Sequence, residues 1–347
     1  MNDLISIVVP IYHAEGFVDN IIRDVLSQTY QNWELLLVSN GDKREKQEEI
    51  CRQYAQQDQR IKLFINEQAG TSRARNKGVE NATGRWLTFL DVDDRIAPSH
   101  LQNYMDAVTD DVDMIIGGFT ELSTTGKETI FELERHNSCQ EGGAFFEYIS
   151  SIHTYIQGMT WNKFYKAEVL NKSGIRFHED IVHIEDIVFN YEMFLYCRSI
   201  KTIPMTGYRY IRYSDSTTGR FTPSFEKSFG VLRCLYREIC KLAGYSDDKT
   251  NQILLRRKYS ETYIFIINLF RRDCPICFKD KVKHVKLLLN DKEFINSRRI
   301  VSKNEKRVNL RIFDFFLKMR SPLLLSVGYS VLFRMKSVYV YLKRHAQ

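Results

Sequence analysis

The first third of the chain alternates between short apolar runs and longer segments in which apolar residues recur at helical spacing. Leu4–Ile11 is apolar and β-branched, which is typical of a buried parallel strand. Phe17–Ser27 places its apolar residues three or four positions apart, which predicts an amphipathic helix. The alternation continues and predicts strands at Trp33–Val38, Ile61–Ile65, Arg85–Leu90 and Asp113–Phe119, with helices at Arg44–Gln56 and Gly70–Ala82. Strands that alternate with helices indicate a doubly wound α/β sheet.

Beyond residue 120 the pattern changes twice. It is irregular and mixed up to about residue 220, and from Phe221 onward it is mainly helical. Helices are expected at Ser224–Leu242, Asp247–Arg271 and Ile276–Leu289. We therefore expect an α/β domain over residues 1–220 and a helical C-terminal region over residues 221–347.

Polar side chains follow two of the predicted strands directly. Asn40 comes after the second strand, and Asp91, Asp93 and Asp94 come after the fourth. Because doubly wound sheets bind ligands beyond the carboxyl ends of their strands, we expect these residues at one edge of the sheet. Carboxylates gathered so closely repel one another, and a divalent cation such as Mg²⁺ or Mn²⁺ relieves that repulsion. The alternative is a solvated acidic turn that caps the next helix.

A second cluster of histidines and carboxylates occupies residues 178–186. Its spacings fit no standard zinc site. The pair Glu185 and Asp186 is also explained by the preference of acidic residues for the N-terminal end of a helix. The residues alone leave open whether this pair performs chemistry.

Four sequence elements occur in the same order as in the family 2 glycosyltransferases, which have the GT-A fold. They are Val8–Tyr12, Leu26–Tyr30, Ala74–Gly78 and Gly84–Asp94. The chain resembles this family strongly over residues 3–120 and more loosely to about residue 215. The resemblance implies a Rossmann-like, mixed but mostly parallel sheet that is flanked by helices. It also implies inverting transfer of a sugar from a nucleotide-diphosphate sugar to a hydroxyl group, in the synthesis of a bacterial surface polysaccharide.

The resemblance assigns residues that bind the donor. Pro10 and Tyr12 match positions that contact the nucleotide, and Arg75 matches a position near the base and the diphosphate. Asn40 stands where many members carry an aspartate that accepts a hydrogen bond from uracil. An amide oxygen still accepts such a bond, so a UDP-sugar is the expected donor.

Metal-binding and catalytic residues also follow from the resemblance. Asp91 and Asp93 match the D-x-D motif, which implies binding of the donor ribose and of Mn²⁺ or Mg²⁺, and Asp94 is a second candidate metal ligand. Glu185 and Asp186 match a catalytic Glu-Asp pair at the start of a helix, in which the second carboxylate is the general base.

The segment Gly158–Lys166 is similar to a later element of the same family. Trp161 offers a flat apolar face of the kind that packs on sugar rings, and Lys163 offers a positive charge for a phosphate or a hydrogen bond for the acceptor. The alternative for Trp161 is a buried position between domains. The expected acceptor is a glycan or a lipid-linked glycan.

The charge of the chain is unevenly distributed. The whole sequence carries +7, and the segment from Arg298 to the C-terminus carries +10, which leaves −3 for residues 1–297. Residues 307–345 combine basic side chains with apolar ones, but the uncharged stretch 321–333 is too short to span a bilayer. We expect this segment to contact an anionic membrane surface, with packing on the domain as the alternative. No nucleic-acid motif occurs, so nucleic acid is not an expected partner.

The apolar run that starts at Leu4 is short, lacks a basic flank and is broken by Pro10, which is not typical of a signal peptide. We therefore expect a cytoplasmic protein, peripheral on the inner face of the membrane. Two other functions stay open. A sugar nucleotidyltransferase would carry a glycine-rich loop where Pro10–His13 stands, and a non-catalytic scaffold that binds nucleotide-sugars or glycans is favoured by the altered Ser39-Asn40.

Overall fold

The computed structural model describes residues 3–42, 45–123, 125–139, 154–182, 184–213, 221–223, 225–301, 313–315, 317–318 and 321–331. The chain forms two compact units. The first comprises Met1–Ser216 with Leu242–Gly244, and the second comprises Thr217–Lys241 and Tyr245–Gln347.

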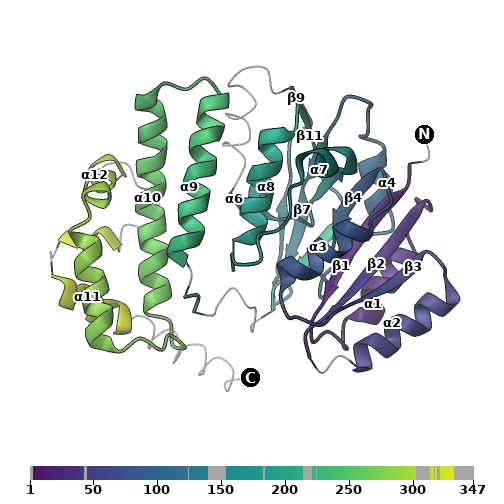
Figure 1. The fold of residues 1–347 in the computed structure, drawn as a ribbon, viewed down its shortest axis with the longest axis horizontal. Helices are drawn as coiled ribbons and strands as arrows, with labels where there is room; N and C mark the ends of the chain where they lie inside the picture. The colour runs from purple at the N-terminus through teal and green to yellow at the C-terminus, as the bar shows by residue number, and fades with distance from the viewer. Residues whose placement is uncertain are drawn as a thin grey trace. The chain divides into compact units, whose positions relative to one another are not determined.

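An eight-stranded sheet forms the centre of the first unit, with the strand order β3-β2-β1-β4-β10-β6-β11-β9 (Figure 1). Its parallel part consists of β1 (Ile5–Ile11), β2 (Trp33–Asn40), β3 (Ile61–Asn66) and β4 (Trp86–Phe89). β1 pairs in parallel with β2 on one side and with β4 on the other, so these three strands end at the same edge. Every residue of β2 and β4 is buried, which explains their nearly continuous apolar sequences.

The remaining strands make the sheet mixed. β10 (Lys163–Lys166) runs antiparallel between β4 and β6 (Met114–Gly117). β11 (Ser199–Ile203) pairs in parallel with β6, and β9 (His136–Cys139) closes the sheet as an antiparallel edge strand. The expectation of a mixed, mostly parallel α/β sheet flanked by helices is therefore confirmed.

Three helices connect the first four strands, and each begins and ends close to the limits expected from the sequence. They are α1 (Val18–Leu26), α2 (Glu45–Gln57) and α3 (Thr71–Asn81). α3 lies against β1, and a Cβ atom at Gly78 would stand 2.2 Å from Cγ1 of Val8. The absence of a side chain at Gly78 therefore allows the helix to lie this close to the strand. The later helices of this unit are α4 (His100–Met105), α6 (Thr154–Gly158), α7 (Ala167–Ser173) and α8 (Glu185–Tyr196).

A second, four-stranded sheet follows the acidic segment after β4. Its order is β5-β12-β7-β8, with β5 (Arg95–Ile96), β12 (Tyr208–Ile211), β7 (Phe119–Leu122) and β8 (Glu128–Phe131). These strands are two to four residues long, which is too short for a periodic sequence pattern, and the sequence did not predict them as a second sheet. β12 brings residues near position 210 back to the segment that follows β4.

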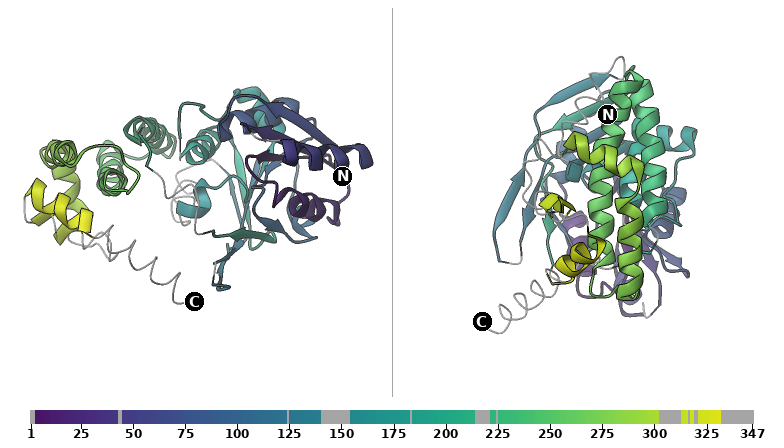
Figure 2. Two further views of the ribbon diagram at one scale, coloured as in Figure 1. Left: turned by 90° about the horizontal axis from the view of Figure 1, so that it is seen from below. Right: turned by 90° about the vertical axis from the view of Figure 1, so that its left-hand side faces the viewer.

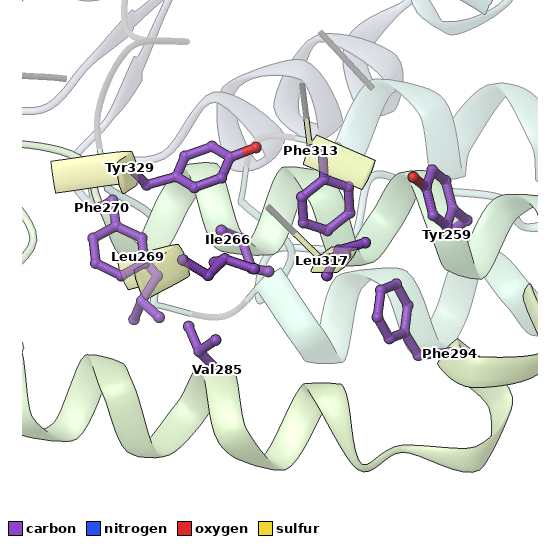
Figure 3. Packing of buried hydrophobic residues seen from close by; sticks show 10 residues of the cluster. Tyr259, Ile266, Leu269, Phe270, Val285, Phe294, Phe313, Leu317 and Tyr329 are labelled. Carbon is purple, nitrogen blue, oxygen red and sulfur yellow. The ribbon is translucent and has the colours of Figure 1, made fainter. Parts of the chain in front are cut away.

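The second unit is helical, as expected. Its helices are α9 (Phe225–Leu242), α10 (Asp247–Leu269), α11 (Phe278–Leu289) and α12 (Lys292–Val301), and residues 322–331 are also helical. α9 and α10 lie side by side (Figures 1 and 2). Aromatic and aliphatic side chains from α10, α11, α12 and the segments beyond residue 312 form one core, which includes Tyr259, Phe294, Phe313 and Tyr329 (Figure 3). Within the described residues, every helix is too short or too polar to cross a lipid bilayer.

Candidate active site

The carboxyl ends of β1 and β2 carry an exposed aromatic ring beside a buried amide. Tyr12, which follows β1, is 52% exposed, and Pro10 in β1 is half-buried. The ring of Tyr12 lies across Gly41, where a Cβ atom would stand 2.6 Å from Cε2 of the ring. Gly41 also has φ 84°, a conformation that favours glycine. The glycine therefore allows the tyrosine to lie over the end of β2.

Asn40 is buried at the end of β2, and a hydrogen-bond chain fixes the orientation of its amide. Nδ2 of Asn66 donates to the carbonyl oxygen of Gln68 at 2.8 Å and to Oδ1 of Asn40 at 3.1 Å. Because a carbonyl oxygen only accepts, the atom of Asn66 that faces it is the amide nitrogen. The same reasoning makes the atom of Asn40 that faces Asn66 the oxygen. Asn40 thus already accepts one hydrogen bond within the protein.

The acidic segment after β4 holds Asp91 and Asp93 in different surroundings. Oδ1 of Asp91 lies 3.3 Å from Nη2 of Arg75, so this carboxylate is ion-paired. Asp93 has no basic side chain within ion-pair distance among the residues that the structure describes. Burial, reinforced by the negative charge of Asp91, raises the pKa of Asp93 to about 6. Of the two carboxylates, Asp93 is the one that lacks a compensating charge.

Asp94 is buried, and both of its oxygens accept hydrogen bonds from β12. The phenol of Tyr208 donates to Oδ2 at 2.6 Å, and the backbone N–H of Ile211 donates to Oδ1 at 2.7 Å. Burial, together with the charge of Asp91, raises the pKa of Asp94 well above its ordinary value. In this arrangement Asp94 joins the end of β4 to the second sheet.

Glu185 and Asp186 form the first turn of α8, as the sequence predicts. Burial, opposed by Arg75 and reinforced by the charges of Glu185 and Asp91, raises the pKa of Asp186 to about 7. The amide of Asn190, one turn later, donates to the backbone oxygens of Asp186 and of Gly158, both at 2.8 Å. Asn190 therefore links the backbone at Asp186 to the last residue of α6.

Arg75 joins the two acidic groups. Its side chain is only 4% exposed, and its guanidinium forms ion pairs with Asp186, with Glu185 at 3.5 Å and with Asp91 at 3.3 Å. Burial lowers the pKa of Arg75, but the three carboxylates together outweigh it and raise that pKa above its already high ordinary value, so the guanidinium is always charged. The structure thus brings the predicted D-x-D motif and the predicted catalytic pair to one guanidinium.

The site carries more negative than positive charge. Asp91, Asp93, Glu185 and Asp186 contribute four carboxylates, against the single guanidinium of Arg75. Across the described part of the chain, no three His, Cys, Asp or Glu side chains are arranged to enclose a metal ion by themselves. Mg²⁺ and related ions are commonly held by one or two carboxylates and by the phosphates of a substrate. An uncompensated carboxylate at Asp93 beside Asp91 fits that mode of binding.

Residues 6–170 match the family model described as glycosyl transferase family 2. The chain carries a family 2 glycosyltransferase domain. It is 23% identical to the putative glycosyltransferase EpsH of Bacillus subtilis (strain 168) over 300 residues, which cover 84% of this chain and 85% of that protein. It is 32% identical to the putative teichuronic acid biosynthesis glycosyltransferase TuaG of the same organism over 104 residues, 30% of this chain and 41% of that protein.

A solved structure shows the same fold as this glycosyltransferase. The crystal structure of S. aureus TarS 1-349 in complex with UDP-GlcNAc matches with a TM-score of 0.65 and 17% sequence identity, over 96% of this chain and 92% of that chain. The family model confirms the expected family 2 domain over residues 6–170, and the solved structure confirms the expected GT-A fold. The residue roles and the metal stay predictions.

Two residues that the sequence assigns to the acceptor are buried inside the glycosyltransferase domain. Trp161 stacks on Tyr208, with ring centroids 4.3 Å apart, and on Tyr210 at 5.6 Å. The ammonium group of Lys163 donates to the backbone oxygens of Ile156, at 2.8 Å, and Met159, and to Oδ1 of Asn162 at 2.9 Å. Its three N–H donors are thus used within the protein, and burial lowers its pKa well below the ordinary value. Both side chains are therefore engaged in contacts within the protein.

Asn76 and Tyr208 were not among the predicted site residues. Asn76 holds the backbone of Phe177 by two hydrogen bonds, one donated by its Nδ2 at 2.9 Å and one accepted by its Oδ1 at 2.8 Å. Tyr208 donates to Asp94. Asn76 lies within the family element Ala74–Gly78, so a signal for it was present. The partners of both residues lie about one hundred positions away, which spacing along the chain does not reveal.

Proposed function

We propose that this domain catalyses inverting transfer of a sugar from a UDP-sugar to a hydroxyl of a glycan or lipid-linked glycan, in the synthesis of a surface polysaccharide. The observation that carries the proposal is the guanidinium of Arg75, which contacts Asp91 at the end of β4 and Asp186 at the start of α8. A donor-side carboxylate and a base of raised pKa therefore share one site. TarS has been crystallised with UDP-GlcNAc and with UDP, and TuaG is named for teichuronic acid biosynthesis, which supports the nucleotide and the polysaccharide.

The proposed cofactor is Mn²⁺ or Mg²⁺, with Asp93 as the principal protein ligand and Asp91 beside it. Asp94 is the weaker candidate, because its two oxygens already accept hydrogen bonds from Tyr208 and Ile211. When bound, the ion would stabilise the negative charge that develops on the leaving diphosphate. Removal of the ion with EDTA is therefore expected to abolish transfer.

Asp186 is the proposed general base. Its carboxylate takes the proton of the acceptor hydroxyl while the hydroxyl oxygen forms a bond to the anomeric carbon of the donor sugar. The bond from that carbon to the diphosphate oxygen breaks on the opposite side, so the configuration is inverted. A base with a pKa near 7 is suited to this transfer at neutral pH, because about half of it is ionised and it still has appreciable affinity for the proton.

Tyr12, Pro10 and Asn40 are the proposed contacts of the nucleotide at the carboxyl edge of β1 and β2. Tyr12 presents an exposed ring of the kind that stacks on a base, and Asn40 is the buried last residue of β2. Aromatic rings and amides of this type are common in sites that bind a planar heterocycle.

Release of UDP tests the proposal. Wild-type protein is incubated with a panel of UDP-sugars and with Mn²⁺, Mg²⁺ or EDTA, and free UDP is measured with and without bacterial glycan acceptors. Metal-dependent release from one sugar supports the proposal. Binding of UDP-sugars without release, under every condition, would instead support the non-catalytic scaffold.

We also propose that the basic C-terminal segment contacts the inner face of the cell membrane. Of the predicted segment 307–345, residues 307–312 and 332–345 lie outside the described residues, together with 316, 319 and 320. The helix 322–331 packs Leu325 and Tyr329 into the core of the second unit and exposes Leu323, Leu324, Val327 and Val331. Exposed apolar side chains within the C-terminal region, which carries +10 from Arg298 to the end of the sequence, support binding to an anionic lipid surface.

A further inference from the structure

α3 is the fixed helix on which the start of α8 is held. Gly78 of this helix lies against Val8 of β1, at a distance that leaves no room for a side chain on the helix. Two side chains of α3 bind the segment that leads into α8. Asn76 makes two hydrogen bonds with the backbone of Phe177, and Nε of Arg73 lies 2.7 Å from Oε2 of Glu179. A third side chain of α3, that of Arg75, forms an ion pair with Asp186 in the first turn of α8.

The contacts of Arg75 differ in kind from those of Arg73. Arg73 is 38% exposed and its partner Glu179 is 49% exposed, so water competes for this pair. Arg75 is 4% exposed and is shared among Asp91, Glu185 and Asp186, which come from two separate elements. Removal of its charge would leave three carboxylates facing one another without a counter-ion.

The side chain of Asp186 depends on Arg75 more than its backbone does. Asn190 donates to the backbone oxygen of Asp186, so the first turn of α8 is held without the arginine. The only basic side chain within ion-pair distance of the Asp186 carboxylate, among the residues that the structure describes, is that of Arg75. The orientation of the carboxylate relative to Asp91 is therefore set by one guanidinium, which is planar and can hold two partners at once.

We propose that Arg75 is a positioning residue that ties the carboxylate of Asp186 to Asp91 and so fixes the base relative to the donor end of the site. This inference rests on the proposed function of Asp186 as the base. It differs from the family-based expectation for Arg75, in which the arginine acts as a ligand of the donor. A ligand of the donor would change donor affinity, whereas a positioning residue changes turnover.

Kinetics of Arg75→Gln and Arg75→Lys separate these two roles. The substrate is the UDP-sugar from which the wild-type protein releases UDP fastest, and the Kd of UDP is measured by calorimetry. For Arg75→Gln we expect kcat to fall about 10²-fold, because a small displacement of a catalytic group has an effect of that size. KM for the donor and the Kd of UDP are expected to change less than about threefold. Lysine keeps the positive charge but lacks the planar guanidinium, which can bind two carboxylates at once. Arg75→Lys should therefore have a kcat between those of Arg75→Gln and the wild-type protein.

Arg73→Gln is the matched control, since it removes another arginine of α3 that pairs with the segment before α8. We expect near wild-type kcat for this variant. Loss of UDP affinity with unchanged kcat in Arg75→Gln would overturn the inference and make Arg75 a donor ligand. An equal loss of kcat in Arg73→Gln would overturn it too, because it would indicate general loosening of the segment.

Crystal structures decide the matter without turnover. In the absence of ligand, Arg75→Gln is expected to keep the backbone of the first turn of α8 in place, because Asn190 still holds it, and to turn the carboxylate of Asp186 away from Asp91. Arg73→Gln should leave that carboxylate where it is. If the wild-type protein releases UDP from no sugar, the proposed function fails. An Asp186 carboxylate that keeps its place beside Asp91 in Arg75→Gln would then contradict the positioning role on its own.

Discussion

The carboxyl group of Asp186 lies beside one guanidinium and two other carboxylates, and burial dominates its titration. With a pKa raised to about 7, it is protonated and inactive as a base at lower pH. We therefore expect the rate of UDP release to rise about tenfold per pH unit below pH 7 and to level off above it. The pH dependence of kcat/KM between pH 5 and 8.5 would measure this, because that ratio reports the pKa of the protein without bound donor.

Asp186→Asn provides the companion measurement. The amide is nearly isosteric with the acid but cannot take a proton, so turnover should fall by about 10²–10⁴, while the Kd of UDP stays within about threefold. The residual rate of this variant should also no longer increase as the pH rises towards 7. A variant that keeps near wild-type turnover would rule out Asp186 as the base.

Asn40 is expected to influence which base the protein binds. Its oxygen already accepts a hydrogen bond from Asn66, and its Nδ2 group can donate to an acceptor such as N3 of cytosine or a carbonyl of uracil. An aspartate at this position only accepts, and it therefore favours the N3–H of uracil. We predict that Asn40→Asp raises the preference for UDP over CDP by about tenfold, as measured by calorimetric Kd values.

The decisive quantity is the ratio of the Kd of CDP to the Kd of UDP. A general weakening of the site raises both Kd values alike and leaves this ratio unchanged. Asn66→Leu is the control that removes the partner of Asn40 without placing a charge at position 40. An unchanged ratio in Asn40→Asp would show that the side chain does not contact the base.

At the scale of elements, the close approach of α3 to β1 depends on Gly78. An alanine there would bring Cβ to 2.2 Å from Val8, so the helix or the strand must shift. We expect Gly78→Ala to cost about 1–3 kcal/mol in the free energy of unfolding and to lower the melting temperature by several degrees.

Gly230 in α9 is the matched control for that substitution. A Cβ atom at Gly230 would meet nothing within 4 Å, and alanine is favoured over glycine within a helix by about 1 kcal/mol. Gly230→Ala should therefore keep or raise the melting temperature. If both alanine variants melt at the same temperature, the packing of α3 on β1 is looser than the structure shows.

The elements that the sequence predicted are those with strong periodicity. β1 and β2 are buried parallel strands with long apolar runs, and β3 is a half-buried one; the limits of all three lie within two residues of the expected ones. β10 was missed, because Lys163–Lys166 has charged residues at both ends and reads as a polar motif. Its Lys163 is buried because backbone oxygens of Ile156 and Met159 accept its hydrogen bonds, a compensation that no local pattern displays.

The candidate site was predictable to a similar extent. The resemblance located Asp91, Asp93 and Asp186, and the structure gathers Asp91 and Asp186 around Arg75. It did not reveal that Asp94 accepts hydrogen bonds from Tyr208 and Ile211, since those partners come from the second sheet. Contacts between residues more than one hundred positions apart depend on the tertiary fold, which single-sequence patterns do not encode.

For the whole molecule, the charge asymmetry of the sequence predicts where a membrane would bind. Leu324 and Val327 are exposed on the helix 322–331, on the side opposite to Leu325 and Tyr329. Burial of a side chain of this size in lipid contributes about 1.5–3 kcal/mol. We expect the double variant Leu324→Gln with Val327→Gln to reduce binding to phosphatidylglycerol vesicles at least about tenfold in a flotation assay.

The control for this assay is Leu287→Gln, which removes an exposed leucine from α11. It should float as the wild-type protein does. Binding that is equal for anionic and neutral vesicles, or equal for wild type and the double variant, would argue against a lipid surface as the partner of this helix.

The two hydrogen bonds between Asn76 and Phe177, and the ion pair between Arg75 and Asp186, tie both ends of one short stretch of chain to a single helix. A stretch anchored in this way can be exchanged as a cassette. Other sequences grafted between Phe177 and Glu185 would bring new side chains close to Asp186 and keep Glu185 and Asp186 themselves unchanged. This region is therefore the natural place to diversify when new acceptors are sought by directed evolution.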